Sequence, residues 1–221
     1  MGVVIGFQYK GKLHRIEGGK ESSLAPSGVS GVSDWHRTFR NSPNIGTVLV
    51  LFKEGGAAHF FREPLHELFR ASISLDNFML RSELLALEEQ ITEAKNDSVR
   101  IGCVERFLLN RLTGKEPDKL VLAALALIHK SKGAIRINEL MEQLHISQSP
   151  LEKRFRQVVG TSPKKFASIV RFKALMQQSS DASSLVELAY EAGFYDQSHF
   201  IKEFKNFTGE TPENFFRDER T

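Results

Sequence analysis

The sequence predicts an α+β protein, with a small mixed strand/helix N-terminal domain followed by an all-α domain of two helix-turn-helix units joined by a long helix. Three observations support this prediction. A β-branched apolar run lies in the first part of the chain, helical patterns follow one another beyond Asp118, and a short-helix, turn, helix pattern occurs twice among them. The 221 residues are enough for two small domains, each with its own core.

Short strands and turns are expected at the start of the chain. Residues 3–9, a Lys-Gly-Lys turn and residues 13–16 together predict a β-hairpin. Residues 18–33 are rich in glycine and serine, which favours a loop. Residues 47–52 form a β-branched, apolar run of strand length that ends before two consecutive glycines. This region is therefore expected to contribute the strands of the N-terminal domain.

The pattern then changes to helical spacing. Residues 64–69 predict a short helix, and residues 82–94 place leucine and isoleucine near a 3.6-residue period. Asp97 is a candidate N-cap for a further helix, with Ile101 on its apolar side. A segment containing glycine and proline follows that helix. We therefore predict an N-terminal domain at residues 1–112, a linker at 113–118 and a second domain at 119–221.

The rest of the chain is expected to be helical. Residues 120–129 are apolar on nearly all sides, which predicts a buried helix. Ser162 and Pro163 are suited to the N-cap and first position of a longer helix. This longer helix is predicted at residues 164–178. The other helices are predicted at residues 137–144, 148–159, 185–192 and 196–207.

The C-terminal region contains an internal repeat. Segments 137–141, 147–156 and 160–166 correspond to segments 185–189, 196–205 and 209–215. In a helix-turn-helix unit the first helix packs on the core, and the second places its N-terminal side chains in the major groove. Four apolar side chains at a spacing of four in the second helices are expected to face the protein interior: Leu151, Phe155, Phe200 and Phe204.

The remaining polar positions of the second helices are the candidate DNA-binding residues. Gln, Lys, Glu and Ser can each hydrogen-bond to base edges, whereas basic side chains one turn further along suit phosphates. The candidates for base contacts are Gln148, Ser149, Glu152, Lys153, Gln197, Ser198, His199 and Lys202, and those for phosphate contacts are Arg156 and Lys205.

Two facts favour DNA contact over an ordinary solvated helix face, which is the usual explanation of such residues. The polar positions recur in both copies of the repeat, and the charge is unevenly distributed. Residues 130–173 hold 10 Lys or Arg against 3 Asp or Glu, whereas residues 1–117 hold 15 against 14. A concentration of positive charge is typical of a phosphate-binding surface.

The region from residue 137 to residue 216 resembles the DNA-binding domain of AraC/XylS-type transcriptional regulators. The resemblance implies seven helices, with recognition helices that enter successive major-groove segments on one face of DNA, ~34 Å apart. Pro150 departs modestly from the pattern, because it suits a first helical turn but reads no base. The residues that carry the resemblance are 188–194, Ser198, Phe200, Phe204, Lys205, Gly209, Thr211 and Pro212.

The N-terminal half is similar to an uncharacterised domain found on a subset of AraC-type regulators. Residues 46–58, 64–68 and 87–90 carry this similarity. It implies a domain that senses a signal or mediates dimerisation. In that family more strand structure usually precedes the equivalent of Val4, so a complete ligand-binding barrel is not expected.

No enzyme or metal site is expected from the remaining residues. Cys103 is the single cysteine and falls in an apolar pattern, which predicts a buried structural thiol. The pair Gly55-Gly56 lacks the Gly-Lys-Ser/Thr of a phosphate loop. Four histidines do not have the spacing of metal ligands: His14, His36, His59 and His66. Five aromatic residues could line a pocket for an apolar effector, but core packing is the preferred interpretation: Trp35, Phe39, Phe52, Phe60 and Phe61.

The sequence thus predicts a bacterial, cytoplasmic, sequence-specific DNA-binding regulator, expected to be an activator. No run reaches the ~18 apolar residues of a membrane span, and no signal-peptide core is recognised. The expected partners are double-stranded DNA and RNA polymerase, with a small-molecule effector and a homodimer left open; no cofactor is expected. One alternative is a co-regulator that acts through protein partners and binds DNA weakly. Another is a DNA-repair enzyme fused to this domain, which Cys103 without a cysteine cluster argues against.

Overall fold

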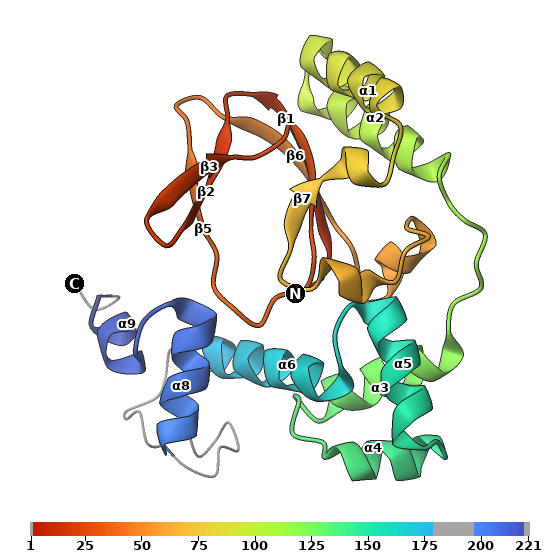
Figure 1. Ribbon diagram of the computed structural model, residues 1–221, viewed down its shortest axis with the longest axis vertical. Coiled ribbons are helices and arrows are strands. Elements are labelled where there is room, and N and C mark those ends of the chain that lie inside the picture. The colour runs from red at the N-terminus through yellow and green to blue at the C-terminus, as the bar shows by residue number, and fades with distance from the viewer. Residues whose placement is uncertain (1, 179–196, 219–221) are drawn as a thin grey trace. The chain divides into compact units, whose positions relative to one another are not determined.

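The computed structural model describes residues 2–178 and 197–218, and the chain divides into two compact units. The first unit comprises Met1–Val32, Arg37–Pro117 and Gln157–Gly160, and the second comprises Ser33–His36, Asp118–Arg156 and Thr161–Thr221. All strands of the described residues belong to the first unit, and the second contributes only helices to them. The predicted α+β class is therefore confirmed (Figure 1).

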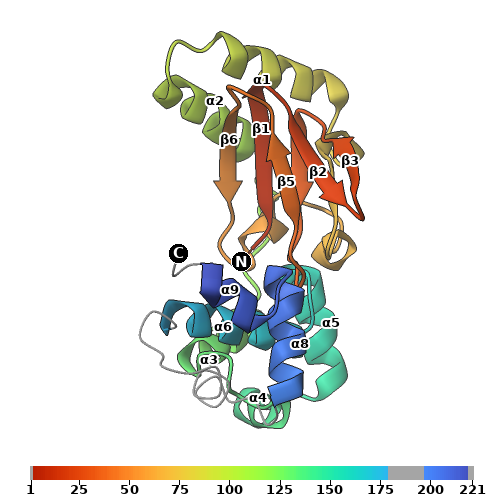
Figure 2. The same cartoon turned by 90° about the vertical axis from the view of Figure 1, so that its left-hand side faces the viewer.

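The first unit contains two antiparallel sheets (Figures 1 and 2). In the four-stranded sheet the order is β6-β1-β4-β7, and in the three-stranded sheet it is β3-β2-β5. The strands are β1 (Val4–Lys10), β2 (Leu13–Glu17), β3 (Lys20–Ser23), β4 (Ser27–Ser30), β5 (Thr38–Asn41), β6 (Gly46–Leu51) and β7 (Ser72–Ser74).

The predicted hairpin between residues 3–9 and 13–16 is wrong, although both strands exist. β1 pairs with β4 and β6, whereas β2 pairs with β3 and β5 in the other sheet. Ile5 and Phe7 are fully buried, so β1 is a central strand whose two edges are taken by strands from later in the chain. The Gln8 side chain connects β1 to the start of β2 and to the segment that precedes β4. It accepts from the Leu13 amide at 2.7 Å and donates to the Ala25 carbonyl at 2.7 Å.

The predicted loop at residues 18–33 is also wrong, because β3 and β4 lie within it. Gly18 and Gly19 have φ angles of 55° and 77° and form the two-residue turn between β2 and β3. Positive φ at both turn positions is what a tight hairpin requires and what consecutive glycines supply. In β4, Gly28 stands opposite Gly6 of β1. The glycine and serine residues of this segment thus lie in strands as well as in turns.

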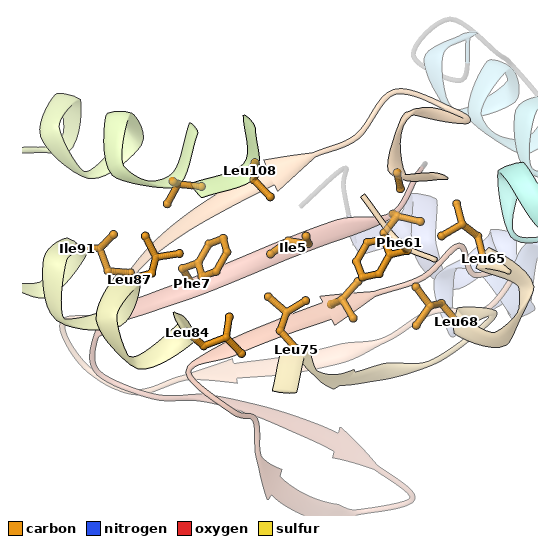
Figure 3. Packing of buried hydrophobic residues seen from close by; sticks show 14 residues of the cluster. Ile5, Phe7, Phe61, Leu65, Leu68, Leu75, Leu84, Leu87, Ile91 and Leu108 are labelled. Atoms are coloured by element: carbon orange, nitrogen blue, oxygen red, sulfur yellow. The ribbon is translucent and has the colours of Figure 1, made fainter. Parts of the chain in front are cut away.

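Two helices, α1 (Arg81–Glu93) and α2 (Asp97–Leu109), pack together against the four-stranded sheet. Figure 3 shows side chains of both helices directed toward β1. Burying each large side chain there stabilises the fold by roughly 1.5–3 kcal/mol. Of the α1 residues near the predicted 3.6-residue period, Leu84, Leu87 and Ile91 are buried, whereas Leu85 is 49% exposed. The core includes Ile5, Phe7, Leu84, Leu87, Ile91, Val104 and Leu108, with Leu65, Leu68 and Leu75 from the short helices η2 (Leu65–Leu68) and η3 (Leu75–Asn77).

Several details of the N-terminal predictions need correction. The N-cap of α2 is Asn96, whose side chain accepts from the Val99 amide at 3.0 Å, and Asp97 is the first helical residue. Ile101 is exposed, so the apolar side of α2 was placed too broadly. Cys103 is half-buried and packs against the core. Of the five aromatic residues, Phe61 is in the core with Phe52 and Phe60 packed against it, whereas Trp35 and Phe39 are exposed.

The second unit is built from helices, and the predicted helices at 137–144, 148–159 and 164–178 are confirmed. The predicted helix at 120–129 is also present, but it is buried on one side only, since Leu122 is 45% exposed. None of the helices in the described residues is long and apolar enough to cross a membrane. The helices are α3 (Lys119–Lys130), α4 (Ile137–Leu144), α5 (Gln148–Val159), α6 (Pro163–Gln178), α8 (Gln197–Thr208) and α9 (Pro212–Asp218).

Candidate nucleic-acid interface

Helix α6 supports both α5 and α8 through aromatic pairs. The Phe155 ring of α5 lies 5.7 Å from the Phe166 ring of α6, and the Phe204 ring of α8 lies 5.5 Å from the Phe172 ring of α6. Phe166 and Phe172 are separated by about 9 Å along α6, given the rise of an α-helix. Figure 1 shows α6 running from α8 toward α3 and α5. The predicted connecting helix therefore has direct contacts with both candidate recognition helices.

The two copies of the repeat form matching structures in the described residues. α5 and α8 are each 12 residues long and begin at the corresponding glutamines, Gln148 and Gln197. Each helix is followed by a glycine in the left-handed region, Gly160 with φ 94° and Gly209 with φ 91°. Such a glycine ends a helix without a Cβ penalty. The next helices, α6 and α9, then each begin at a proline.

The predicted cap of α6 is also present. The Ser162 Oγ accepts from the Lys165 amide at 3.3 Å, and Pro163 is the first residue of the helix. A hydroxyl at this position satisfies one of the amides that the first turn of a helix leaves unpaired. The exit of α5 is thus fixed by local chemistry that the sequence makes visible.

The inward side chains of α5 and α8 are buried as predicted. Leu151, Phe155, Phe200 and Phe204 are each at most 1% exposed. The candidate DNA-binding residues lie on the remaining surface of the two helices. Glu152 is partly exposed, and the others are exposed: Gln148, Ser149, Lys153, Arg156, Gln197, Ser198, His199, Lys202 and Lys205.

On α5, three of these residues contact one another through Glu152. The Gln148 Nε2 donates to the Glu152 carboxylate at 2.9 Å, and the Arg156 guanidinium lies 3.5 Å from the same carboxylate. Pairs of this kind on a surface contribute little stability, so DNA could displace them at small cost. The contacts do hold two candidate DNA-binding side chains along one stripe of the helix.

On α8, the corresponding surface carries a different arrangement. Lys202 and Lys205 form no ion pair with the described part of the chain. Ile201, which corresponds to Glu152, is an apolar side chain with 36% of its surface exposed. Ile201 is not among the residues predicted from the sequence to contact DNA, although the alignment of the two repeat copies places it within the outward stripe. An exposed isoleucine there can contact a thymine methyl group.

Each candidate recognition helix also contacts a residue outside the helix through one lateral side chain. The two side chains stand at corresponding positions of the repeat, and one is basic whereas the other is acidic. The Arg154 guanidinium donates from Nε and Nη2 to the two Asp118 carboxylate oxygens, both at 2.8 Å. Asp118 in turn caps α3, accepting from the Leu120 and Val121 amides at 3.1 Å. Burial acts to raise the pKa of Asp118, but the hydrogen bonds from Arg154 and the two amides outweigh burial and lower it.

The equivalent of Arg154 in α8 is Glu203. Its carboxylate accepts from the Ser168 hydroxyl of α6 at 3.0 Å. Arg154 and Glu203 are not recognisable as contact residues from the sequence, because their partners lie in other helices.

Part of the predicted site falls outside the described residues. This applies to the helix expected at 185–192, to the turn that follows it and to the motif at 188–194 that most strongly carries the AraC resemblance. Within the residues that the structure does describe, no group of three or more His, Cys, Asp or Glu side chains could hold a metal ion.

Comparison with known proteins places the C-terminal region in a family. Residues 140–218 match the family model of a helix-turn-helix domain. The Msm operon regulatory protein of Streptococcus mutans is 26% identical over 156 residues, which cover 69% of this chain and 56% of that protein. An uncharacterized HTH-type transcriptional regulator of Haemophilus influenzae is 27% identical over 156 residues, covering 69% of this chain and 51% of that protein. The chain thus spans about half the length of these curated relatives.

Among solved structures, ToxT from Vibrio cholerae matches with a TM-score of 0.49 and 13% sequence identity, over 97% of this chain and 88% of that chain. The matched family model covers α5, α6, α8 and α9, the helices that carry the candidate interface. Residues 140–218 of this chain therefore form a region that matches a helix-turn-helix domain.

Proposed function

We propose that the chain is a sequence-specific DNA-binding transcription regulator that reads two successive major-groove segments with α5 and α8. In this proposal residues 119–221 bind DNA, and residues 1–112 sense a signal or mediate dimerisation. The observation that carries it is the matching outward surface of the two helices. Each begins with Gln-Ser and carries a lysine at the corresponding later position, Lys153 or Lys202.

The residue types on this surface suit base recognition. A glutamine can form two hydrogen bonds with adenine, a lysine can donate to the guanine O6 and N7 atoms, and a glutamate can accept from the cytosine amino group. Arg156 and Lys205, one turn beyond the first residues of the stripe, suit phosphate contacts. Ile201 adds an apolar contact on α8 only, so the two helices would prefer different base sequences.

The charge distribution and the relatives support the same function. Residues 130–173 have a formal balance of +7, from 10 Lys or Arg and 3 Asp or Glu. Two of the relatives are named an operon regulatory protein and an HTH-type transcriptional regulator. We further propose that the protein is an activator, with RNA polymerase as its protein partner, and that it responds to a small-molecule effector.

Selection of bound sites from random DNA tests the proposal. We expect a recovered consensus with two conserved blocks one helical turn apart, and binding to it at least ~10³-fold tighter than to mixed DNA at physiological salt. Weak, equal binding to selected and mixed DNA, falling steeply with salt, would instead indicate a co-regulator that acts through protein partners.

Two further measurements separate the remaining alternatives. Exposure to alkylated DNA followed by measurement of the intact mass should leave the mass unchanged. An alkyl group transferred to Cys103 would identify a repair enzyme. Transcription from a promoter that carries the selected site, with purified RNA polymerase, distinguishes an activator from a repressor by the direction of the change.

A further inference from the structure

An open cavity of about 800 Å³ lies between the two sheets of the first unit. Residues of both sheets line it. Figure 1 shows that the two sheets face each other. Ligand sites in proteins commonly have volumes of roughly 300–1,000 Å³ and mostly apolar walls with a few polar groups. The apolar side chains of its walls include Val4, Leu13, Leu24, Phe39, Ile45 and Leu49.

The cavity face of the four-stranded sheet is apolar although the core lies on the opposite face. Ile5 and Phe7 of β1 point into the core, so the alternation of a strand directs Val4 and Gly6 to the cavity. A sheet face in contact with water is ordinarily polar. Here Leu49 is 58% exposed and Phe39 is 41% exposed. Covering such surface with an apolar molecule is favourable by roughly 25 cal/mol per Å².

Two glycines leave room at the middle of this face. Gly6 of β1 and Gly28 of β4 are direct partners in the sheet, and both line the cavity. A Cβ added at Gly6 would lie 3.4 Å from the Leu49 Cδ2, in ordinary contact with a flexible side chain. A larger side chain at this position could therefore be accommodated by the strand, and it would occupy part of the cavity.

Arg37 supplies a cation that no carboxylate of the described residues balances. Its Nη2 donates to the Gly31 carbonyl at 3.2 Å, and it forms no ion pair with the described residues. A guanidinium has five N–H donors, so most of them remain available. Burial lowers the pKa of Arg37, and repulsion from Arg15 lowers it further. An anion in the cavity would offset both effects.

A buried hydroxyl at the same cavity has no partner among the described residues. The Ser74 Oγ is buried and has no hydrogen-bond partner among the described residues, and Ser74 lines the same cavity. Leaving a buried hydroxyl unpaired is costly, and a ligand oxygen would satisfy it. The cavity thus combines apolar walls, one available cation and one unpaired hydroxyl.

We infer that this cavity binds a small organic anion with an apolar body, whose carboxylate pairs with Arg37 and whose body covers Val4, Phe39 and Leu49. Guanidinium and carboxylate form paired, charge-assisted hydrogen bonds, and this pairing would select a carboxylate over a neutral amide of the same shape. The inference deepens the effector part of the proposed function by giving the site and the chemical class of the ligand.

Calorimetric titration of the full chain tests the inference with two probe pairs: octanoate against octanamide, and 4-phenylbutanoate against 4-phenylbutanamide. We expect at least one carboxylate to bind at least about tenfold more tightly than its amide, because one charge-assisted pair is worth that much. Arg37→Gln should remove this preference and leave amide binding unchanged. Arg40→Gln is the matched control, because Arg40 pairs with Glu21 and does not line the cavity.

Gly6→Val tests the location of the ligand. We expect it to weaken binding of carboxylate and amide alike by about tenfold or more, with the thermal unfolding midpoint of the protein retained. Failure of both carboxylates to bind the wild type, or binding that Arg37→Gln and Gly6→Val leave unchanged, overturns the inference. Binding to the selected DNA, measured on the same proteins, shows separately whether the proposed function holds.

Discussion

Helices α5 and α8 have the same length, begin with the same two residues and bury side chains at corresponding positions, but they differ in the contacts of their outward and lateral residues. On α5, Glu152 joins Gln148 and Arg156, and Arg154 binds Asp118. On α8, the positions of Glu152 and Arg154 are occupied by Ile201 and Glu203.

This difference separates what the repeat keeps from what it varies. The kept features set the helix boundaries and the packing on α6, which any helix-turn-helix unit needs. The varied features lie on the outward stripe and on the lateral contacts to neighbouring helices. We interpret the first group as a common framework and the second as the means by which each helix acquires its own base preference and its own support.

The largest expected effect tests the common framework. Phe155→Ala and Phe204→Ala each remove a buried ring that contacts α6, so each should lower the free energy of unfolding by about 3–5 kcal/mol. Urea denaturation followed by helical circular dichroism measures this, with the exposed Gln157→Ala as control. A loss below about 1 kcal/mol for one variant alone would show that the two helices are not supported in equivalent ways.

The next effect tests the matching lysines. Lys153→Ala and Lys202→Ala should each weaken binding to the selected site by about 1–3 kcal/mol, because each removes one base contact. Fluorescence anisotropy with labelled DNA measures the affinity, and Lys130→Ala at the end of α3 is the control for the loss of a charge. Unchanged affinity in both variants would refute the assigned surfaces.

A smaller effect is expected from the lateral contact of α5. The folded-state pKa of Asp118 is lowered, so its contribution to stability is present above the unfolded carboxyl pKa of about 3.9 and is lost as the pH falls through the folded-state pKa. Asp118→Ala should cost about 1 kcal/mol at pH 7, as expected for loss of an N-cap.

Comparison with the corresponding position of α8 sharpens this prediction. Arg154→Ala should reduce the loss of stability on acidification, because it removes part of what lowers the pKa of Asp118. Glu203→Gln should have little effect at pH 7, since the amide oxygen can still accept from Ser168. Unfolding free energies measured from pH 7 to pH 3 provide the comparison, and identical pH profiles for wild type and Arg154→Ala would contradict it.

The smallest effect concerns the outward stripe of α5. Glu152→Gln removes the one acidic side chain among the candidate residues. It should strengthen binding to mixed DNA by about 0.5 kcal/mol, in the range of exposed charge interactions, and weaken the preference for the selected site. Competition between selected and mixed DNA measures both quantities, and a gain in preference for the selected site would contradict the assigned role.

The helical unit could be predicted from the sequence because its signals are local. Apolar spacing, the Ser162 cap and the glycine-proline exits lie within a few residues of the elements that they determine. The sheet unit could be predicted only in part, because β1 pairs with strands that begin at Ser27 and Gly46. Pairing between distant segments leaves no local pattern. The cavity was missed for the same reason, since its walls come from both sheets.

A similar limit applies to the candidate interface. The outward and inward positions of α5 and α8 follow from helical spacing and from the alignment of the repeat copies. The Arg154–Asp118 and Glu203–Ser168 contacts join different helices and depend on how those helices pack. Local spacing does not determine that packing.

Footprinting of major-groove guanines on the selected site tests the central claim most directly. If α5 and α8 read separate segments, the wild type should protect two blocks about one duplex turn apart, with Lys153→Ala losing protection in one block and Lys202→Ala in the other. Loss of the same block in both variants, or protection of a single block by the wild type, would contradict the account.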